Sequence, residues 1–299
     1  MRPAGARRVA GPWPGAPLAL ALLLAQALAC SSGPLPPASR PRADAEASLA
    51  HARSARTARA WASAARSFGR AADAFAAIDD LAGEASARRE EAEALLRAGE
   101  PAAASRAGGR ALARDRRLGR EEDAARDRAG LARSAAAEGD LARALQEATE
   151  ARAQVATGSS LAAVLDDDLA LYLLERGQDG DHARALELLA RAREASQALG
   201  DARGVATSDL QLGRAALAQG DPEGAAPYLE RALDAFRRLE DPEGLAHTHE
   251  LLARLYLARG DDAAARFERE QARAGFTYLD DRAGLARLDR LGPADARAP

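Results

Sequence analysis

The sequence predicts an all-α solenoid of about six helical hairpins, ended by one further helix. Three observations predict it. A turn made of a glycine and an acidic residue recurs every forty residues. Alanines follow each acid at two fixed distances. Between the turns, apolar residues recur three and four positions apart, which is the periodicity of helices that bury one face. Self-similarity at such a period indicates a stack of identical supersecondary units.

The recurring turn and its two alanines delimit five copies of the unit. The turns are Gly99-Glu100, Gly139-Asp140, Gly180-Asp181, Gly220-Asp221 and Gly260-Asp261. The first alanines are Ala104, Ala144, Ala185, Ala225 and Ala265, and the second are Ala111, Ala151, Ala192, Ala232 and Ala272. One extra residue interrupts the spacing near Gly177–Gly180. An earlier copy, which matches the repeat pattern less well, contains Trp61, Ala64, Phe68, Ala71 and Phe75.

Residues that typically cap the start of a helix precede the later hairpins. Asp201, Asp241 and Asp281 are placed to accept hydrogen bonds from the free amides of the helix that follows. A glycine stands three residues after such positions, at Gly83, Gly204, Gly244 and Gly284. Glycine in a first turn lowers helix stability, so we expect close packing to require it. The helix Asp281–Leu291 would cover the end of the stack, with Arg287 facing solvent.

The composition is that of a globular protein. The 299 residues are 47% hydrophobic and 29% charged, with a formal net charge of -3. Every basic residue is arginine. The near-neutral balance gives no reason to expect nucleic acid, which requires a clustered positive excess.

The first thirty residues resemble an export signal. Arg2, Arg7 and Arg8 precede an apolar run from Leu18 to Ala29 that is too short for a stable membrane span. Cleavage at Ala27-Leu28-Ala29 would release a soluble periplasmic protein. The same residues followed by Cys30, the only cysteine, resemble the lipobox of bacterial lipoproteins. That resemblance implies acylation of Cys30, and Ser31 then implies the outer membrane.

The predicted domains follow from these patterns. Residues 1–29 are the signal peptide, and residues 30–43 a lipid-anchored tether rich in proline and serine. Residues 44–291 form the helical array, and residues 292–299 a disordered tail.

The array resembles tetratricopeptide repeats, in a forty-residue variant with longer helices. The copy at 209–236 fits best, with Leu212-Gly213, Gly220-Asp221, Ala225, Leu229, Ala232 and Phe236. The resemblance implies a right-handed superhelix whose first helices line a concave, partner-binding face. Gly108 departs from the pattern because it stands where a large side chain is expected. Such departures predict that residues 100–165 are the least stable part of the stack.

Arginines gather at the predicted concave face. Arg53, Arg133, Arg214 and Arg254 occupy one equivalent position in four copies. The neighbouring candidates for partner binding are Arg89, His247 and Glu250. A row of guanidinium groups would suit carboxylates such as those of an acidic peptide or a chain terminus. The alternative is that copies of one ancestral repeat simply inherited the same residue.

No pattern indicates catalysis, a cofactor or a metal site. His247 and His249 are two residues apart and would point to different helix faces, so they do not readily chelate one ion. Asp166-Asp167-Asp168 would bind a cation or a basic partner, or favourably face a helix dipole near a helix start.

The sequence therefore predicts a non-enzymatic scaffold or adaptor in the bacterial cell envelope. It would bind protein or peptide partners through its concave groove and the membrane through its lipid anchor, without nucleic acid. The alternative is a self-associating structural envelope lipoprotein without a dedicated client.

Overall fold

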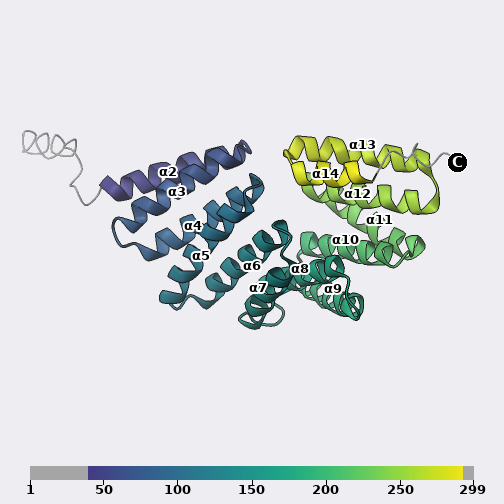
Figure 1. The fold of residues 1–299 in the computed structure, drawn as a ribbon, viewed down its shortest axis with the longest axis horizontal. Helices are drawn as coiled ribbons and strands as arrows, with labels where there is room; N and C mark the ends of the chain where they lie inside the picture. Colours follow the sequence, from purple (N-terminus) through teal and green to yellow (C-terminus); the bar gives the residue numbers. More distant parts are fainter. Residues whose placement is uncertain (1–39, 292–299) are drawn as a thin grey trace, which may run out of the picture. The chain divides into compact units, whose positions relative to one another are not determined.

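The computed structural model describes residues 40–291 of the chain. The predicted signal peptide, Cys30, most of the tether and the tail lie outside these residues. The predicted all-α array is confirmed: the described part consists of helices joined by turns, without a strand. Figure 1 shows these helices following one another in chain order.

Six hairpins and a final helix make up the described array, as the repeat predicted. The helices are α2 Arg40–Thr57, α3 Trp61–Ala76, α4 Leu81–Arg97, α5 Pro101–Arg117, α6 Glu121–Ala137, α7 Leu141–Ala153, α8 Ser160–Arg176, α9 Asp181–Ala198, α10 Ala202–Ala218, α11 Pro222–Arg238, α12 Pro242–Arg259, α13 Asp262–Leu279 and α14 Arg282–Arg290.

The first helices of successive hairpins form one continuous layer. Helix α4 contacts α6, α6 contacts α8, α8 contacts α10, and α10 contacts α12. From α4 onward, each first helix also packs along the second helix of its own hairpin, and α2 shares a buried apolar cluster with α3. We call the surface of α2, α4, α6, α8, α10 and α12 the first-helix layer, since it corresponds to the predicted concave face.

The glycine of each recurring turn adopts a backbone conformation that few other residues tolerate. Gly99, Gly139, Gly180, Gly220 and Gly260 all have φ between 74° and 84°. The extra residue of the fourth copy is absorbed in the turn between α8 and α9, where Gly177 also has a positive φ of 64°. The period of forty therefore survives a local insertion without a change in either helix.

The first-turn glycines mark contacts with phenylalanines of the preceding helix. A Cβ on Gly83 would lie 2.6 Å from the Phe75 ring, and one on Gly244 would lie 2.3 Å from the Phe236 ring. Gly284 has the same relationship with Phe276, at 2.5 Å. Close packing, as expected, explains these glycines. The aspartate caps are also confirmed, since Asp201, Asp241 and Asp281 each accept a hydrogen bond from the glycine amide three residues later.

The acidic run at 166–168 was misassigned to a helix start. It lies well inside α8, beyond reach of the free amides of the first turn. Asp166 instead pairs with Arg152 and Arg191 at 2.9 Å each. Asp167 accepts a hydrogen bond from Ser208 of α10 at 2.9 Å. The buried Asp166 and Asp167 therefore link α8 to the neighbouring helices α7, α9 and α10.

The beginning and the end of the described array contact each other. The Arg59 guanidinium, between α2 and α3, donates to the Tyr278 carbonyl at 3.1 Å and lies 4.3 Å from the centre of its ring. Arg97, at the end of α4, pairs with Glu243 of α12. Within residues 40–291, no helix combines the length and hydrophobicity required to cross a bilayer.

Candidate functional site

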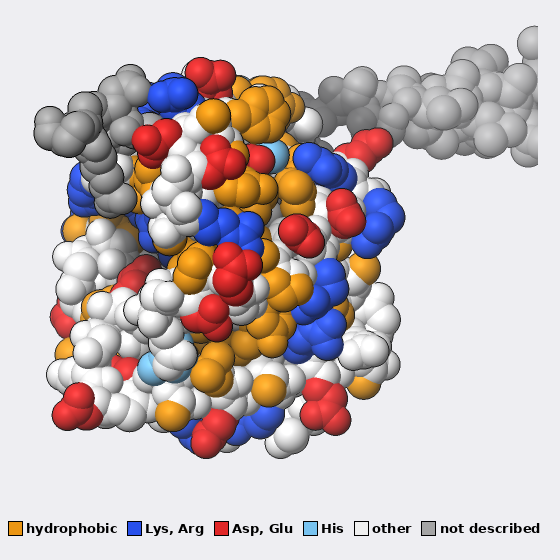
Figure 2. All heavy atoms as spheres, turned by 90° about the vertical axis from the view of Figure 1, so that its right-hand side faces the viewer, with side chains coloured by type: hydrophobic (Ala, Val, Ile, Leu, Met, Phe, Trp, Pro, Cys, Tyr) orange, Lys and Arg blue, Asp and Glu red, His pale blue; other side chains and the backbone are white. Residues whose placement is uncertain are grey.

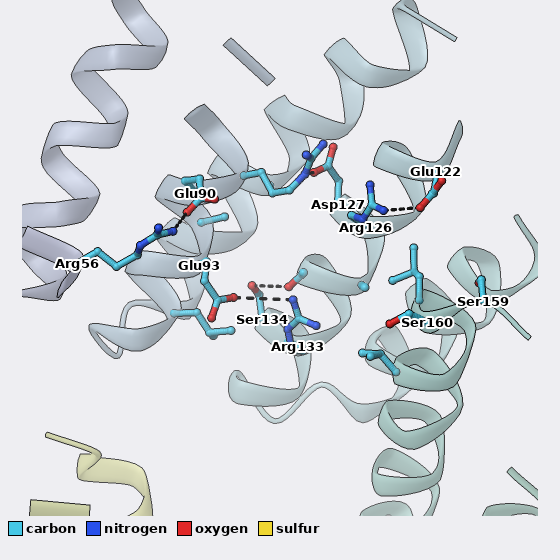
Figure 3. Close-up of a pocket in the computed structure, with 18 residues that line it drawn as sticks. Arg56, Glu90, Glu93, Glu122, Arg126, Asp127, Arg133, Ser134, Ser159 and Ser160 are labelled. Atoms are coloured by element: carbon cyan, nitrogen blue, oxygen red, sulfur yellow. Dashed lines mark hydrogen bonds and ion pairs between the residues drawn. The ribbon is translucent and has the colours of Figure 1, made fainter. Parts of the chain in front are cut away.

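A pocket of about 510 Å³ opens on the first-helix layer between α4, α6 and the start of α8. Figure 3 shows charged side chains of α4 and α6 around it, with Ser159 and Ser160 at the beginning of α8 on one side. Apolar contact surface comes from Leu96, Leu161 and Val164, and Val164 is 41% exposed. The pocket thus offers both apolar surface and hydrogen-bonding groups, as ligand pockets usually do.

The pocket lies where one repeat has glycine in place of a large side chain. Gly108 of α5 lines it. Equivalent positions of the second helices hold Phe68 and Leu229, which are 1% and 0% exposed. A Cβ on Gly108 would meet Leu131 at 3.3 Å, so the larger side chain of the other copies would project into this region. The departure at Gly108 that the sequence revealed therefore creates space, a consequence the sequence alone did not indicate.

The charged walls of the pocket are paired. Arg56 donates to Glu90 at 2.6 Å, and Arg126 donates to Glu122 (Figure 3). Opposite charges thus balance each other around the apolar surface. A ligand that displaced one of these exposed pairs would lose little, because surface ion pairs contribute only about 0–1 kcal/mol.

Two buried carboxylates share one arginine at the base of the pocket. Arg89 donates to Asp127 at 2.6 Å and also to Asp115, and these acids are 2% and 0% exposed. Burial raises the pKa of Asp127 to about 7, with Asp115 adding to the rise and Arg89 opposing it. Asp115 and Asp123 stand where other copies have phenylalanine and the first-turn glycine, as Phe236 and Gly244 do. This repeat therefore replaces an apolar contact with a buried ionic cluster.

A second cluster lies toward the C-terminal end of the layer. Glu250 of α12 is 0% exposed. Arg254 donates to its Oε1 at 2.6 Å, and Arg287 of α14 donates to its Oε2 at 3.2 Å. The His247 ring packs edge-on against Phe276, 5.2 Å between ring centres. Burial raises the pKa of Glu250, but the neighbouring His247 ring, 3.7 Å away, and the two arginines outweigh burial, and the pKa falls to about 2.

Arg214 of α10 completes this cluster without a carboxylate partner. It donates to Gln211 at 2.9 Å, and no carboxylate of residues 40–291 lies within ion-pair distance. Burial lowers its pKa to about 10. Arg254 and Arg287 contribute to this fall, while Glu250 and the exposed Glu175 oppose it. The cluster thus holds more positive than negative charge.

The structure places the sequence candidates in separate groups of the first-helix layer. Arg89 and Arg133 line the pocket, whereas Arg214, His247, Glu250 and Arg254 belong to the C-terminal cluster. Arg53 lines a smaller cavity of about 140 Å³ between α2, α3 and α4. The equivalent arginines do not form a row of free guanidinium groups, since Arg133 pairs with Asp168 at 3.5 Å and Arg254 pairs with Glu250.

Arg287 is the cluster residue that sequence reasoning missed. It was expected to face solvent on the final helix, yet it reaches back to Glu250. Position 287 aligns with His247 and Thr207 of the two preceding copies, which have no arginine there, so those copies do not signal its role. The expectation that His247 and His249 point apart agrees with their partners: His249 Nδ1 lies 2.5 Å from Glu268 Oε2, on the next helix.

The comparisons with known proteins agree with this architecture. The tetratricopeptide repeat model matches residues 162–238 and 204–277. Curated protein sequences give no match. The Rap conjugation gene regulator of the plasmid pLS20, solved in complex with a peptide, has a similar structure: TM-score 0.62, 15% identity, covering 92% of this chain and 70% of that one. BtubC from P. vanneervenii gives a TM-score of 0.48 at 21% identity, covering 82% of this chain and 93% of that one.

The fold and the repeat match define a helical array of the tetratricopeptide repeat type. The tetratricopeptide repeat model matches residues within 162–277, and the Rap regulator has a similar fold. Arrays of this kind typically serve as non-enzymatic scaffolds for interactions between proteins.

Proposed function

We propose that this chain is a protein-interaction scaffold that holds an extended segment of a partner in the pocket at Gly108. The observation that carries the proposal is the pocket itself, which opens on the first-helix layer and combines apolar surface with paired charges. Its volume of about 510 Å³ suits a few side chains of a peptide rather than a whole folded partner. The bound peptide of the Rap regulator supports the idea that such an array accommodates a peptide.

Photo-crosslinking in cells tests this proposal directly. The chain has no lysine, so amine-reactive reagents have no side-chain target. A photoreactive amino acid at Val164, which is 41% exposed in the pocket, should capture a partner. The same amino acid at Leu186 is the matched control, since Leu186 is 38% exposed but lies on the second helix α9.

Filling the pocket should abolish that capture. Gly108→Leu restores a large side chain like that of Leu229, whereas Gly109→Ala adds a methyl group to the adjacent glycine, which has open space around it. Capture at Val164 should therefore disappear in G108L and persist in G109A. Equal capture at Val164 and Leu186, or unchanged capture in a folded G108L variant, would reject the proposal.

We also propose that the chain acts in the bacterial cell envelope, anchored through acylated Cys30. The signal-like segment and the single cysteine support this location. Several acyl chains together would anchor stably. In a bacterial host, the wild-type chain should enter the detergent phase on phase separation, whereas Cys30→Ser should enter the aqueous phase. A soluble wild-type chain cleaved after Ala29 would instead support the periplasmic alternative.

Self-association remains the second candidate because apolar residues recur at the ends of second helices. Leu118, Leu199 and Leu239 follow α5, α9 and α11 and are 40%, 51% and 41% exposed. Equivalent positions with the same exposed side chain could join two copies. Sedimentation of the purified chain tests it: concentration-dependent oligomers that Leu199→Ser and Leu239→Ser abolish would favour this function.

A further inference from the structure

The C-terminal cluster offers a second binding feature, distinct in chemistry from the pocket. Its three arginines come from three helices: Arg214 from α10, Arg254 from α12 and Arg287 from α14. Arg214 and Arg254 occupy the same position in adjacent repeats, and their helices contact each other. The cluster therefore presents guanidinium groups from neighbouring helices at one end of the layer.

Glu250 shows how this cluster holds a carboxylate. Arg254 and Arg287 both donate to it, with Nη2 of each at 2.6 Å and 3.2 Å from its two oxygens. Two guanidinium groups on one carboxylate leave unused donors, because each guanidinium carries five N–H groups. The buried Nε of Arg254 has no hydrogen-bond partner. The arginines are thus only partly satisfied by the chain itself.

The guanidinium groups of the cluster are partly accessible to solvent, although Arg254 Nε itself is buried. The side chains of Arg254 and Arg287 are 33% and 30% exposed, and Arg214 is partly buried. Arg214 donates only to the neutral Gln211 side chain. A partly desolvated guanidinium without a counter-ion is unfavourable, so a carboxylate from a ligand would gain a charge-assisted hydrogen bond there.

We propose that Arg214, Arg254 and Arg287 bind carboxylate side chains of an acidic segment in a partner protein. The proposal rests on the proposed function, because it gives the chemistry of that partner beyond the part held in the pocket. The charge of the cluster favours an acidic rather than a basic segment: three arginines surround the buried Glu250, and the exposed Glu175 acts on Arg214. A general excess of positive charge is not the reason for this preference. Figure 2 shows side chains of both charges interspersed on the side of the array that it draws.

Binding of a hexaglutamate peptide to the purified full chain in detergent tests the proposal. A labelled hexaglutamate should bind the wild type, as fluorescence anisotropy would show, whereas hexaglutamine should not. Arg214→Gln should weaken binding about tenfold, the loss expected for one hydrogen bond between charged groups. Arg238→Gln is the matched control, because it removes one exposed arginine from the second helix α11. It should leave the affinity within about twofold of the wild type.

A second variant guards against loss of folding as the explanation. Glu250→Gln removes the internal carboxylate and frees Arg254 and Arg287, so hexaglutamate should bind more tightly than to the wild type. Equal effects of R214Q and R238Q, no tightening in a folded E250Q variant, or binding of hexaglutamine as strong as that of hexaglutamate would each overturn the proposal.

The experiment separates the anion site from the pocket. Gly108→Leu should bind hexaglutamate as the wild type does, because the pocket is lined by α4, α6 and α8 rather than by the arginine cluster. Capture at Val164 that is no stronger than at Leu186, together with retained binding of hexaglutamate, would reject the proposed function alone. Crosslinking at Val164 without hexaglutamate binding would reject the anion site alone.

Discussion

Arg97 of α4 donates from Nη1 to Glu243 Oε1 of α12 at 2.8 Å, although 146 residues separate the two. Arg59 and Tyr278 make a second contact between the same two parts of the array. The first contact joins hairpins that are four units apart in the array, and the second joins hairpins that are five units apart. Whether these contacts form depends on the summed rotation between successive hairpins. The packing of each hairpin on the next determines each of those rotations.

We expect reversal of one charge to separate these helices. Arg97→Glu places two acids opposite each other, and Arg97→Glu with Glu243→Arg restores the attraction. Both side chains are exposed, so the free energy of unfolding should change by only about 0.2–1 kcal/mol. Spin labels would be placed at Arg66 of α3 and Glu270 of α13 in a Cys30→Ser background. The distribution of distances between them should be broader in R97E than in the wild type. An unchanged distance in R97E would show that the pair does not hold the two parts together.

We expect Gly244→Ala to destabilise the array. The added Cβ would lie 2.3 Å from the Phe236 ring, which is 2% exposed and has no room to retreat. Overpacking of this kind costs about 1–3 kcal/mol. Urea unfolding measures the loss. Gly109→Ala is the control and should be neutral or stabilising by up to about 1 kcal/mol, because its Cβ meets nothing within 4 Å. Equal stability of G244A and the wild type would contradict the packing account.

We expect Asp167→Asn to remove a pH dependence of stability. Burial raises the pKa of Asp167 to about 8, with its acidic neighbours Asp168 and Asp166 adding to the rise. In the unfolded chain the pKa is about 3.9, so folding binds a proton between these two values. The contribution of Asp167 to stability therefore falls as pH rises from about 4 to about 8 and stays constant above.

The variant isolates this contribution, because asparagine keeps an acceptor for Ser208 but does not ionise. The stability of D167N relative to the wild type should rise between pH 5 and pH 8, as urea midpoints would show. Ser208→Ala is the control: it removes the hydrogen-bond donor but keeps the titrating acid. A constant difference between D167N and the wild type at all pH values would refute the assignment.

We expect residues 100–165 to exchange amide hydrogens faster than residues 205–275. This part contains Gly108 and Ala148 where Phe68 and Leu229 stand in other copies, and its helix α7 spans only Leu141–Ala153. Fewer apolar contacts between hairpins lower the free energy of local opening. Hydrogen exchange followed by mass spectrometry measures it, and equal protection of the two regions would reject the prediction.

Local signals made the fold predictable from the sequence. A positive φ favours glycine wherever it occurs, so Gly220 and its four counterparts could be found without tertiary contacts. The Asp241 cap acts within three residues of its own position. The reason for Gly244 is already less local, because it needs Phe236 of the preceding helix, yet both recur in other copies and so were visible as a pattern.

The candidate site was only partly predictable because its residues break the repetition. Gly108 was visible as a departure, but the cavity depends on how neighbours such as Leu131 fill space. Arg287 aligns with His247 and Thr207, so neither of those copies has an arginine at its position, and it contacts Glu250 across 37 residues. The ion pairs of Arg133 and Arg254 also depend on tertiary packing, so the alignment of copies could not show that Arg214 differs from them.

Gly108 also affects the position along the array at which a bound segment can lie. In an array of identical units, a ligand that shifted by one unit would find the same surroundings and lose nothing. Phe68, Leu189 and Leu229 fill the corresponding space in three other units. A segment held beside Gly108 would therefore find no equivalent space at those three units, and its remaining residues would lie at set distances from Gly108.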